Sequence, residues 1–310
     1  MERIVTLTVN PAIDVNTSVD HVVSERKLRC AAPRREPGGG GLNVSRAIRR
    51  LGGASTAYYL AGGPAGELLR HLLDEEGLTQ HVSRIEGWTR ENLIVDDVSS
   101  GEQYRFGMPG PVVQEAEWTR CLSDIGERSP APAYVVASGS LAPGMPDDVY
   151  ARLAGVARER GSRLVLDTSG PALRLGLEAG AFLVKPNMRE FQDLTGEPLD
   201  NEEALARAAR RFVAEGRCSV LVLSLGAGGA LLLKANGPLH IRTPTVPIRS
   251  KVGAGDSMVA GLTLALARGR SVEEAVRYGV AAGAAAVMTP GTELCRKADV
   301  DALFAGMSGS

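Results

Sequence analysis

The sequence predicts an α/β fold in which helices cover both faces of a mostly parallel central sheet. Short runs of β-branched and aliphatic residues alternate with longer segments of helical period along most of the chain. Such alternation is typical of βαβ units, whose strands run parallel. The length of 310 residues fits one large α/β domain, with or without a small appendage, and allows a sizeable core.

The individual elements follow from this alternation in chain order. The first strand, 4–9, reads Ile-Val-Thr-Leu-Thr-Val, a run with high β propensity. Ligands of such folds bind at the carboxyl ends of the strands, so residues that follow a strand are the candidates for a site. We expect further strands at 55–60, 134–137, 163–167, 182–185, 220–224 and 230–234, and helices at 42–51, 66–76, 147–160, 202–215, 256–267 and 272–288.

Two segments interrupt the alternation. Residues 12–36 show no helical period, and residues 92–107 predict two strands around the turn Ser99-Ser-Gly101. Together these segments are expected to form a small sheet beside the main domain. A lid over a substrate and a purely structural hairpin are both open, and the pattern alone favours the hairpin.

Composition and charge exclude several classes of protein. The net charge is −1 and aromatic residues make up 4%, so we expect neither a nucleic-acid partner nor a base-stacking platform. The start of the chain has no long apolar run and reads as a strand, so we expect no signal peptide. The net charge gives no reason to expect a membrane partner, and no uninterrupted apolar stretch reaches transmembrane length. The four histidines lack metal-ligand spacing, and the four cysteines form no CxxC pair. The thiols are therefore expected to be reduced and the protein cytoplasmic.

The most informative motif is the turn Gly253-Ala254-Gly255-Asp256, which an apolar helical run follows at once. The first amides of a helix are unpaired and lie at the positive end of its dipole, so they bind anions. The two glycines remove side chains that would keep an anion away. The turn therefore indicates a site that stabilises a transferring phosphoryl group, with Asp256 accepting a hydroxyl proton. The alternative is that Asp256 only stabilises the helix N-terminus.

Two further motifs carry candidate site residues. Four glycines separate Pro37 from Leu42 and Asn43, which suggests a close backbone approach to a ligand, although a flexible joint is the commoner use of such a run. Asn187 and Glu190 follow a strand and lie three residues apart, hence on one face of a helical turn. They suit a hard cation bound through water, and the alternative is a helix cap with an acidic first turn.

Other candidates lie near strand ends or in the small sheet. The segment Ser224-Leu-Gly226-Ala-Gly228 leads directly into another strand, whereas a dinucleotide fingerprint must open a helix. A glycine-rich floor under a nucleotide remains open for this segment. Arg90 and Arg105 suit a phosphate monoester, although each alone is more often a solvated surface residue. Asp14 suits sugar hydroxyls or an Asx-turn.

In this order the motifs resemble those of the ribokinase-like (PfkB) family of carbohydrate kinases. The two family signatures correspond to Gly38-Gly-Gly-Gly-Leu-Asn43 and Ser250-Lys-Val-Gly-Ala-Gly-Asp256, with Asn187 and Glu190 between them. The resemblance runs over nearly the whole chain and is closest to the branch that phosphorylates fructose 6-phosphate. It implies a single ribokinase-like domain over 1–310, built as a three-layer α/β/α sandwich with a small β-sheet lid formed by about 12–36 and 88–110.

The resemblance also implies a role for each candidate residue. Asp256 is the base, and the backbone amides of the turn before it form an anion hole. Polar side chains and glycines around this turn hold the metal, the nucleotide and the sugar phosphate. The implied sets are Gly253, Ala254 and Gly255 for the anion hole; Asn187 and Glu190 for Mg²⁺ through water; Lys185, Asn187, Ser224, Gly226 and Gly228 for ATP; and Asp14, Lys27, Gly39, Gly40, Asn43, Arg90, Arg105 and Ser140 for the substrate.

The implied activity is ATP-dependent phosphorylation of fructose 6-phosphate at its 1-hydroxyl, which gives fructose 1,6-bisphosphate and ADP in glycolysis. Tagatose 6-phosphate and fructose 1-phosphate are alternative substrates, and a non-catalytic sugar-phosphate sensor is the alternative of another class. The resemblance further implies Mg²⁺ with ATP and a homodimer through the lid. Lys251 departs from the Thr or Ser of relatives, so we expect weakened dependence on K⁺, unless its side chain points to solvent.

Overall fold

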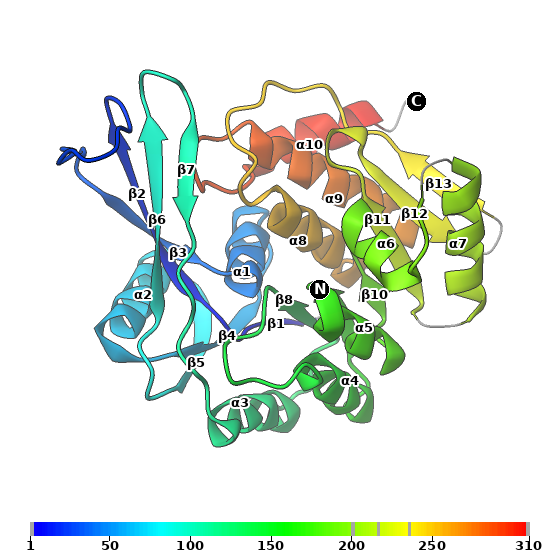
Figure 1. Cartoon of the computed structure of the whole chain (residues 1–310). Coiled ribbons are helices and arrows are strands. Elements are labelled where there is room, and N and C mark those ends of the chain that lie inside the picture. The colour runs from blue at the N-terminus through cyan, green and yellow to red at the C-terminus, as the bar shows by residue number, and fades with distance from the viewer. Residues whose placement is uncertain (1–2, 200–201, 216–217, 235–236, 308–310) are drawn as a thin grey trace.

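The central sheet contains nine strands within residues 3–199, 202–215, 218–234 and 237–307, the part of the chain that this computed structural model describes (Figure 1). They are β1 (Ile4–Thr8), β4 (Thr56–Ala61), β5 (Thr79–Arg84), β8 (Tyr134–Ser138), β9 (Arg163–Asp167), β10 (Leu183–Val184), β11 (Val220–Ser224), β12 (Ala230–Lys234) and β13 (Gly237–Ile241). Their order across the sheet is β13-β12-β11-β10-β9-β8-β1-β4-β5. Only β12 runs antiparallel to its neighbours, so the predicted mostly parallel sheet is confirmed.

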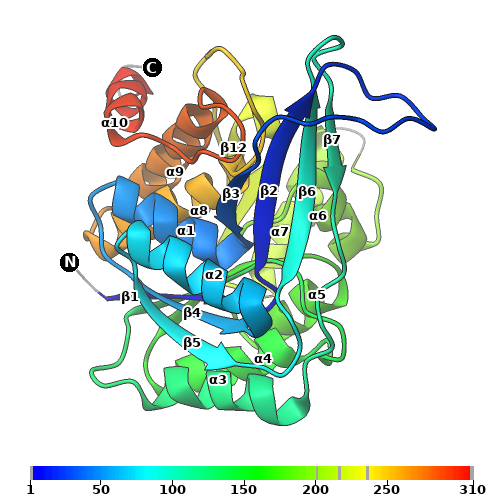
Figure 2. The ribbon, with the colours of Figure 1, turned by 90° about the vertical axis from the view of Figure 1, so that its left-hand side faces the viewer.

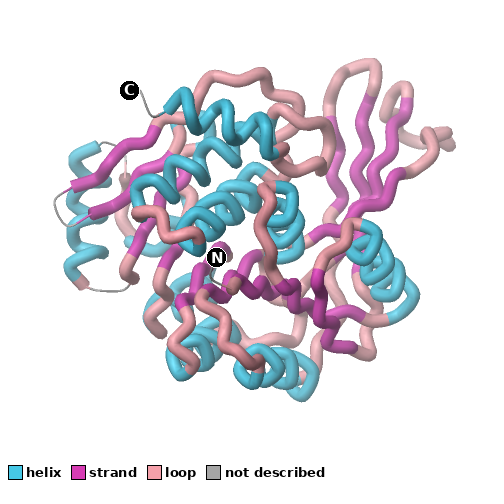
Figure 3. Tube along the Cα trace, turned by 180° about the vertical axis from the view of Figure 1, so that it is seen from behind, coloured by secondary structure: helices cyan, strands magenta, loops and turns pink. Residues whose placement is uncertain are grey.

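Helices form a layer on each face of this sheet (Figure 3). Strands alternate their side chains between the faces, so Leu7 of β1 enters one core while Ile4 enters the other. The three-layer α/β/α arrangement predicted from the sequence is therefore confirmed. One layer contains α3 (Glu115–Glu127), α4 (Val149–Glu159), α5 (Gly170–Glu178), α6 (Met188–Thr195) and α7 (Glu202–Ala214), and the other α1 (Gly40–Arg50), α2 (Gly63–Glu75), α8 (Ala254–Ala267), α9 (Val272–Val287) and α10 (Lys297–Gly306).

A second, four-stranded sheet stands beside the main body, and we call it sheet B (Figure 2). Its strands, in order, are β3 (Arg34–Gly38), β2 (Ala12–Val19), β6 (Arg90–Asp97) and β7 (Gln103–Phe106). β6 and β7 form an antiparallel hairpin, while β2 and β6 run parallel. The small sheet expected from the two interrupting segments, with its hairpin, is therefore present.

The two faces of sheet B differ in chemistry. Residues opposite each other in register share a face, so Asp14 lies beside Asn92, which donates to it at 2.8 Å. This polar face meets the main body, where Asn16 donates to Thr292 Oγ1 at 3.5 Å. The opposite face packs on α2 near its base, but farther along it leaves the facing pair Leu93 and Phe106 exposed, by 37% and 48%.

The predicted elements are all present, with ends that differ by a few residues. The pattern did not predict the edge strands β5 and β13, because Thr79-Gln-His and Gly237-Pro are polar or turn-forming rather than β-like. It also did not predict α3, α5, α6 and α10. Helix α1 begins inside the glycine run, at Gly40, rather than after it.

Helix α8 is buried from Ser257 onward, because α9 packs closely along it. A Cβ on Gly279 of α9 would lie 2.8 Å from the carbonyl oxygen of Met258, and one on Gly261 would lie 2.8 Å from the Ala282 Cβ. Glycine therefore lets the two backbones approach and sets the position of the first turn of α8. Within the described ranges neither α8 nor any other helix is long and apolar enough to cross a membrane.

We expect Gly279→Ala to lower the free energy of unfolding by about 1–3 kcal/mol, because the new methyl group would press on the α8 backbone. Urea unfolding measures this change. The control is Gly155→Ala in α4, where the nearest atom to a new Cβ is 4.0 Å away. That variant should gain about 0.5–1 kcal/mol from helix propensity. Equal behaviour of the two variants would show that the α8–α9 contact is not as tight as described.

Candidate active site

The first turns of α1 and α8 meet at the carboxyl edge of the central sheet. The side-chain amide of Asn43, in α1, donates from Nδ2 to Asp256 Oδ2, in α8, at 3.0 Å. The two residues lie 213 positions apart in the sequence. This single contact joins the two predicted motifs, the glycine run with Asn43 and the Gly-Ala-Gly turn with Asp256.

The glycine run at 38–41 allows α1 to approach the strands. A Cβ on Gly40 would overlap Ser138 at the end of β8, and a Cβ on Gly41 would overlap the carbonyl group of Leu7 in β1. Gly39 caps the helix with a φ of 116°, a conformation that favours glycine. The run is therefore a packing device rather than a flexible joint. The close approach of a ligand to these residues stays a prediction.

The Asp256 carboxylate is partly buried, and this burial raises its pKa to about 6. The hydrogen bond from Asn43 opposes the rise, Asp167 adds to it, and the positive charges of Lys185 and Arg46 oppose it. At neutral pH the group is therefore mostly ionised and yet more basic than an ordinary aspartate. Such a carboxylate is suited to accept a proton.

The turn before Asp256 places unpaired amides beside a cation. Gly253 caps α8 with a φ of 74°, and the amide of Ser257 is the first to bond back to it, at 2.8 Å. The amides of Ala254 and Gly255 precede this bond, at the positive end of the helix dipole. A Cβ on Gly255 would meet only Lys185, with Nζ 3.8 Å away. The geometry is that of an anion-binding site.

Lys185 and Asp167 form an ion pair at the ends of β10 and β9, with Nζ 3.1 Å from Oδ1. Burial opposes the charged form of Lys185, but Asp167, Asp256 and Glu190 together raise its pKa above the usual value. The lysine is therefore cationic. Asp167 was not among the residues predicted from the sequence, although it ends a predicted strand, the position where site residues are expected.

Asn187 and Glu190 form a capping box at the start of α6. Asn187 Oδ1 accepts from the Glu190 amide at 2.9 Å, and Glu190 Oε2 accepts from the Asn187 amide at 2.8 Å. The helix-cap alternative is therefore confirmed. Among the described residues Glu190 Oε1 accepts no hydrogen bond, and in this part of the chain no cluster of three or more His, Cys, Asp or Glu residues exists that could hold a metal alone.

The segment Ser224–Gly228 lies beside this cap. Ser224 ends β11, forms an isolated bridge with Asn187, and donates from Oγ to the carbonyl of Pro186 at 3.3 Å. A 3₁₀ turn over Gly226–Gly228 then leads into β12. No helix follows these glycines directly, in agreement with the sequence argument against a dinucleotide fingerprint.

Most of the predicted substrate residues gather on the other side of Asp256. A Cβ on Gly38 would lie 2.7 Å from Asp14 Oδ2. Asn10 connects two others, because its backbone carbonyl accepts from Arg90 Nη2 at 3.0 Å and its side chain donates to Ser140 Oγ at 3.3 Å. Arg90 Nε is buried without a partner in the described structure. The contacts therefore bring Asp14, Arg90 and Ser140 to the base of sheet B, next to the glycine run.

The structure keeps Lys27 apart from this group, whereas Arg105 faces Ile94 in register and so lies on the same face of sheet B as Asp14, without contacting it. Both side chains are exposed, and within the described residues neither side chain makes a hydrogen bond or an ion pair. Lys27 lies on the loop after β2. The first residue of β2 pairs with Gly38, next to α1, and its last residue pairs with Asp97. The loop therefore leaves sheet B at the end away from α1 (Figure 2).

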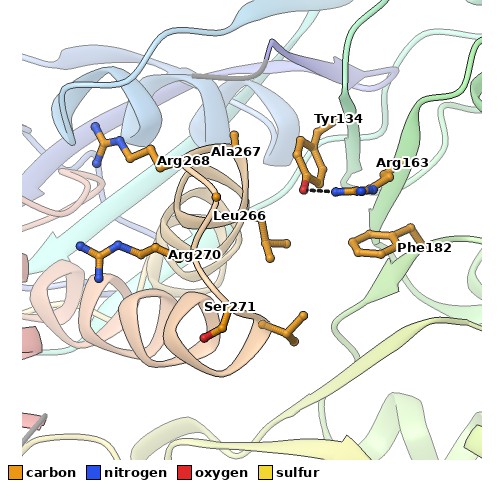
Figure 4. A pocket seen from close by; sticks show the side chains of 10 residues that line it. Tyr134, Arg163, Phe182, Leu266, Ala267, Arg268, Arg270 and Ser271 are labelled. Atoms are coloured by element: carbon orange, nitrogen blue, oxygen red, sulfur yellow. Dashed lines mark hydrogen bonds between the residues drawn. The ribbon is translucent and has the colours of Figure 1, made fainter.

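A hollow of about 700 Å³ opens at the opposite, amino edge of the strands, between β8 and the end of α8 (Figure 4). Arg163 donates to the Tyr134 hydroxyl at 2.6 Å and stacks on Phe182. The side chains of Arg268 and Arg270 point away from this pair (Figure 4). Arg268 bonds the carbonyls of the α1 C-terminus instead. The hollow is therefore lined by the three arginines Arg163, Arg268 and Arg270 and is separate from Asp256.

Comparison with curated proteins gives relatives over nearly the full length of the chain. The ATP-dependent 6-phosphofructokinase isozyme 2 of Mycobacterium tuberculosis is 44% identical over 302 residues, which cover 97% of this chain and 89% of that protein. The enzyme of the same name from Escherichia coli is 43% identical over 309 residues, 99% of this chain and 100% of that one. A 1-phosphofructokinase of Xanthomonas campestris is 35% identical over 84% of this chain and 83% of its own length.

Solved structures agree with these relatives. A crystal structure of E. coli phosphofructokinase-2 in complex with potassium superimposes with a TM-score of 0.95 at 43% identity, covering 99% of this chain and 100% of that one. Crystal structures of the same enzyme with fructose-6-phosphate and in a tetrameric inhibited form each give a TM-score of 0.93 at 42% identity, with the same coverage. The pfkB family carbohydrate kinase model matches residues 7–299. The chain therefore belongs to the pfkB family of carbohydrate kinases.

Proposed function

We propose that the protein transfers the γ-phosphoryl group of ATP to the 1-hydroxyl of fructose 6-phosphate, giving fructose 1,6-bisphosphate and ADP. The observation that carries this proposal is the position of Asp256, a carboxylate with a pKa of about 6 in the first turn of an anion-binding helix. The names of the M. tuberculosis and E. coli relatives support the choice of sugar. A cytoplasmic location remains a prediction.

In this mechanism Asp256 removes the proton from the sugar hydroxyl as its oxygen attacks phosphorus in line. The amides of Gly253, Ala254 and Gly255 stabilise the charge on the transferring group. Lys185 adds a positive charge beside Gly255, and Asp167 keeps this lysine protonated. The transfer needs positioning and charge stabilisation, and the described residues supply both.

Nucleotide and metal are assigned to the α6 side of the site. We assign ATP to Lys185, Asn187, Ser224, Gly226 and Gly228, which border one surface at the ends of β10 and β11. Mg²⁺ bound with ATP would neutralise phosphate charge. Asn187 and Glu190 would hold its water, since their capping box leaves acceptor capacity at the surface.

The sugar phosphate is assigned to the sheet B side. Asp14, Gly39, Gly40 and Asn43 would face the sugar, and Arg90, Arg105, Ser140 and Lys27 its phosphate. Within the described residues the side chains of Lys27 and Arg105 make no hydrogen bond or ion pair. We therefore propose that sheet B, which carries Arg105, acts as a lid over the sugar. Its exposed pair Leu93 and Phe106 also supports a homodimer through this lid, whereas the E. coli relative has a tetrameric form.

The proposed substrate is tested by comparing kcat/KM for fructose 6-phosphate, tagatose 6-phosphate and fructose 1-phosphate with Mg-ATP. We expect the highest value for fructose 6-phosphate. The X. campestris relative makes 1-phosphofructokinase activity the main alternative, and a preference for fructose 1-phosphate would support it. Absence of turnover with all three sugars would favour the sensor.

We expect Asp256→Asn to lower kcat by roughly 10²–10⁴-fold with little change in KM, because a general base is lost while binding groups remain. The wild-type rate should fall as the pH drops through about 6, where Asp256 becomes protonated. Steady-state kinetics between pH 5 and 8 measure both effects. The control is Asp299→Asn, which removes a carboxylate from the first turn of α10 as Asp256→Asn does from α8. Equal losses in the two variants would reduce Asp256 to a helix-stabilising residue.

The Lys251 side chain is exposed, which favours the alternative in which it points to solvent and leaves the loop carbonyls to a monovalent cation. We therefore expect K⁺ to activate the enzyme more than Na⁺, and Lys251→Thr to leave this ratio unchanged. Rates in matched K⁺ and Na⁺ buffers measure it. If K⁺ activated the Lys251→Thr variant but not the wild type, the weakened dependence on K⁺ predicted from the sequence would be supported instead.

A further inference from the structure

A chain of polar contacts continues from Asp256 into the second layer of the protein. Asn43 donates to Asp256 Oδ2, and its own Oδ1 accepts from Arg46 Nη1 at 3.0 Å. Asn43 and Arg46 lie three residues apart on α1, hence on one face of the helix. A guanidinium group only donates hydrogen bonds, so the Asn43 atom beside it is the oxygen, and the amino group faces Asp256.

Arg46 is held on three sides although it is buried, with 1% of its surface exposed. Nη1 also donates to the carbonyl of Pro37 at 2.9 Å, and Nε and Nη2 donate to the carboxylate of Glu76 at 2.9 Å and 2.7 Å. Glu76 is the C-cap residue of α2. The guanidinium group is therefore fixed by hydrogen bonds to the segment before the glycine run on one side and to α2 on the other.

We propose that Arg46, held by Glu76, is a positioning residue for Asp256, and this proposal rests on the role assigned to Asp256 above. By fixing the Asn43 side chain, Arg46 keeps Oδ2 of Asp256 occupied by a donor. Within the described residues Oδ1 accepts no hydrogen bond, so it is the oxygen left to take the hydroxyl proton. Neither Arg46 nor Glu76 needs to touch a substrate for this purpose.

The other charged groups around Asp256 cannot replace this contact. Lys185 at the end of β10 and Asp167 at the end of β9 face Asp256 with opposite charges and are paired with each other. Helix α9 approaches the first turn of α8 through Gly283, where a Cβ would lie 3.2 Å from the Ala254 carbonyl oxygen, and it brings no charge there. The orientation of the carboxylate therefore depends on α1.

The test variant is the double substitution Arg46→Met with Glu76→Gln, which removes the donor to Asn43 without leaving an unpaired charge. Two readouts are independent of each other. The first is the pKa of Asp256 in the free protein, followed by ¹³C NMR of its carboxyl carbon. This signal is assigned as the one that is missing from the spectrum of Asp256→Asn. The second is the dependence of kcat and KM on pH.

We expect the Asp256 pKa and the acid limb of the rate profile to rise together by about one unit, because a donor and a nearby positive charge are weakened. At neutral pH kcat should fall by roughly 10- to 100-fold while KM for both substrates changes little, since only the base is displaced. Arg46→Lys retains charge and one donor, so it should recover part of kcat.

The control is Arg49→Gln, one turn farther along α1. Arg49 donates to the backbone carbonyl of the same Glu76 at 2.6 Å but does not reach Asn43. It should behave as wild type in both readouts. An unchanged Asp256 pKa and unchanged kcat in the folded double variant would overturn the proposal. A different outcome would separate the two proposals. If the Asp256 pKa rose in the double variant while Asp256→Asn kept full activity, the positioning by Arg46 would stand and the function assigned to Asp256 would be overturned.

Discussion

The hydrogen bond between Asn43 and Asp256 is the contact on which the rest of the site depends. It exists only because two helices from distant parts of the chain reach the same point at the sheet edge. Gly40 and Gly41 bring α1 against β8 and β1, and Gly279 brings α9 against α8. A single methyl group at any of these positions would displace a backbone. The distance between a proton acceptor and the group that orients it is thus set by the packing of helices on strands and on each other.

The basicity of Asp256 results from opposing effects, of which burial is the largest. Burial alone would favour the protonated carboxyl group, which cannot accept a proton, whereas full hydration would leave an ordinary aspartate that is a weaker base. The donor on Asn43 and the cations Lys185 and Arg46 offset part of the burial, and the pKa stays at about 6. A base of this strength is ionised at neutral pH and still gains from taking a proton. The same buried carboxylate therefore needs its neighbours in order to work at all.

Features that depend on local sequence could be predicted without the structure. The alternation of strands and helices is local, so the parallel sheet and its core were predictable, and the turn Gly253–Asp256 carries its own helix start signal. Asn187 and Glu190 show the limit of such reasoning, because a capping box and a water-mediated cation site use the same two side chains. The structure shows the box, with both bonds formed, and the box holds the two side chains at the surface where a cation would need them.

Features that depend on contacts between distant segments could not be predicted. Arg46 belongs to a helix whose polar residues look solvent-exposed in the sequence, yet it is buried because α2 ends beside it and supplies the Glu76 carboxylate. Burying a guanidinium group is costly unless its donors are used, and here all three nitrogens donate, to Glu76, Pro37 and Asn43. Its chemistry suits the role, because a planar group with donors on several sides can hold a carboxylate and a carboxamide in fixed directions at once. A lysine could supply the charge but not this geometry.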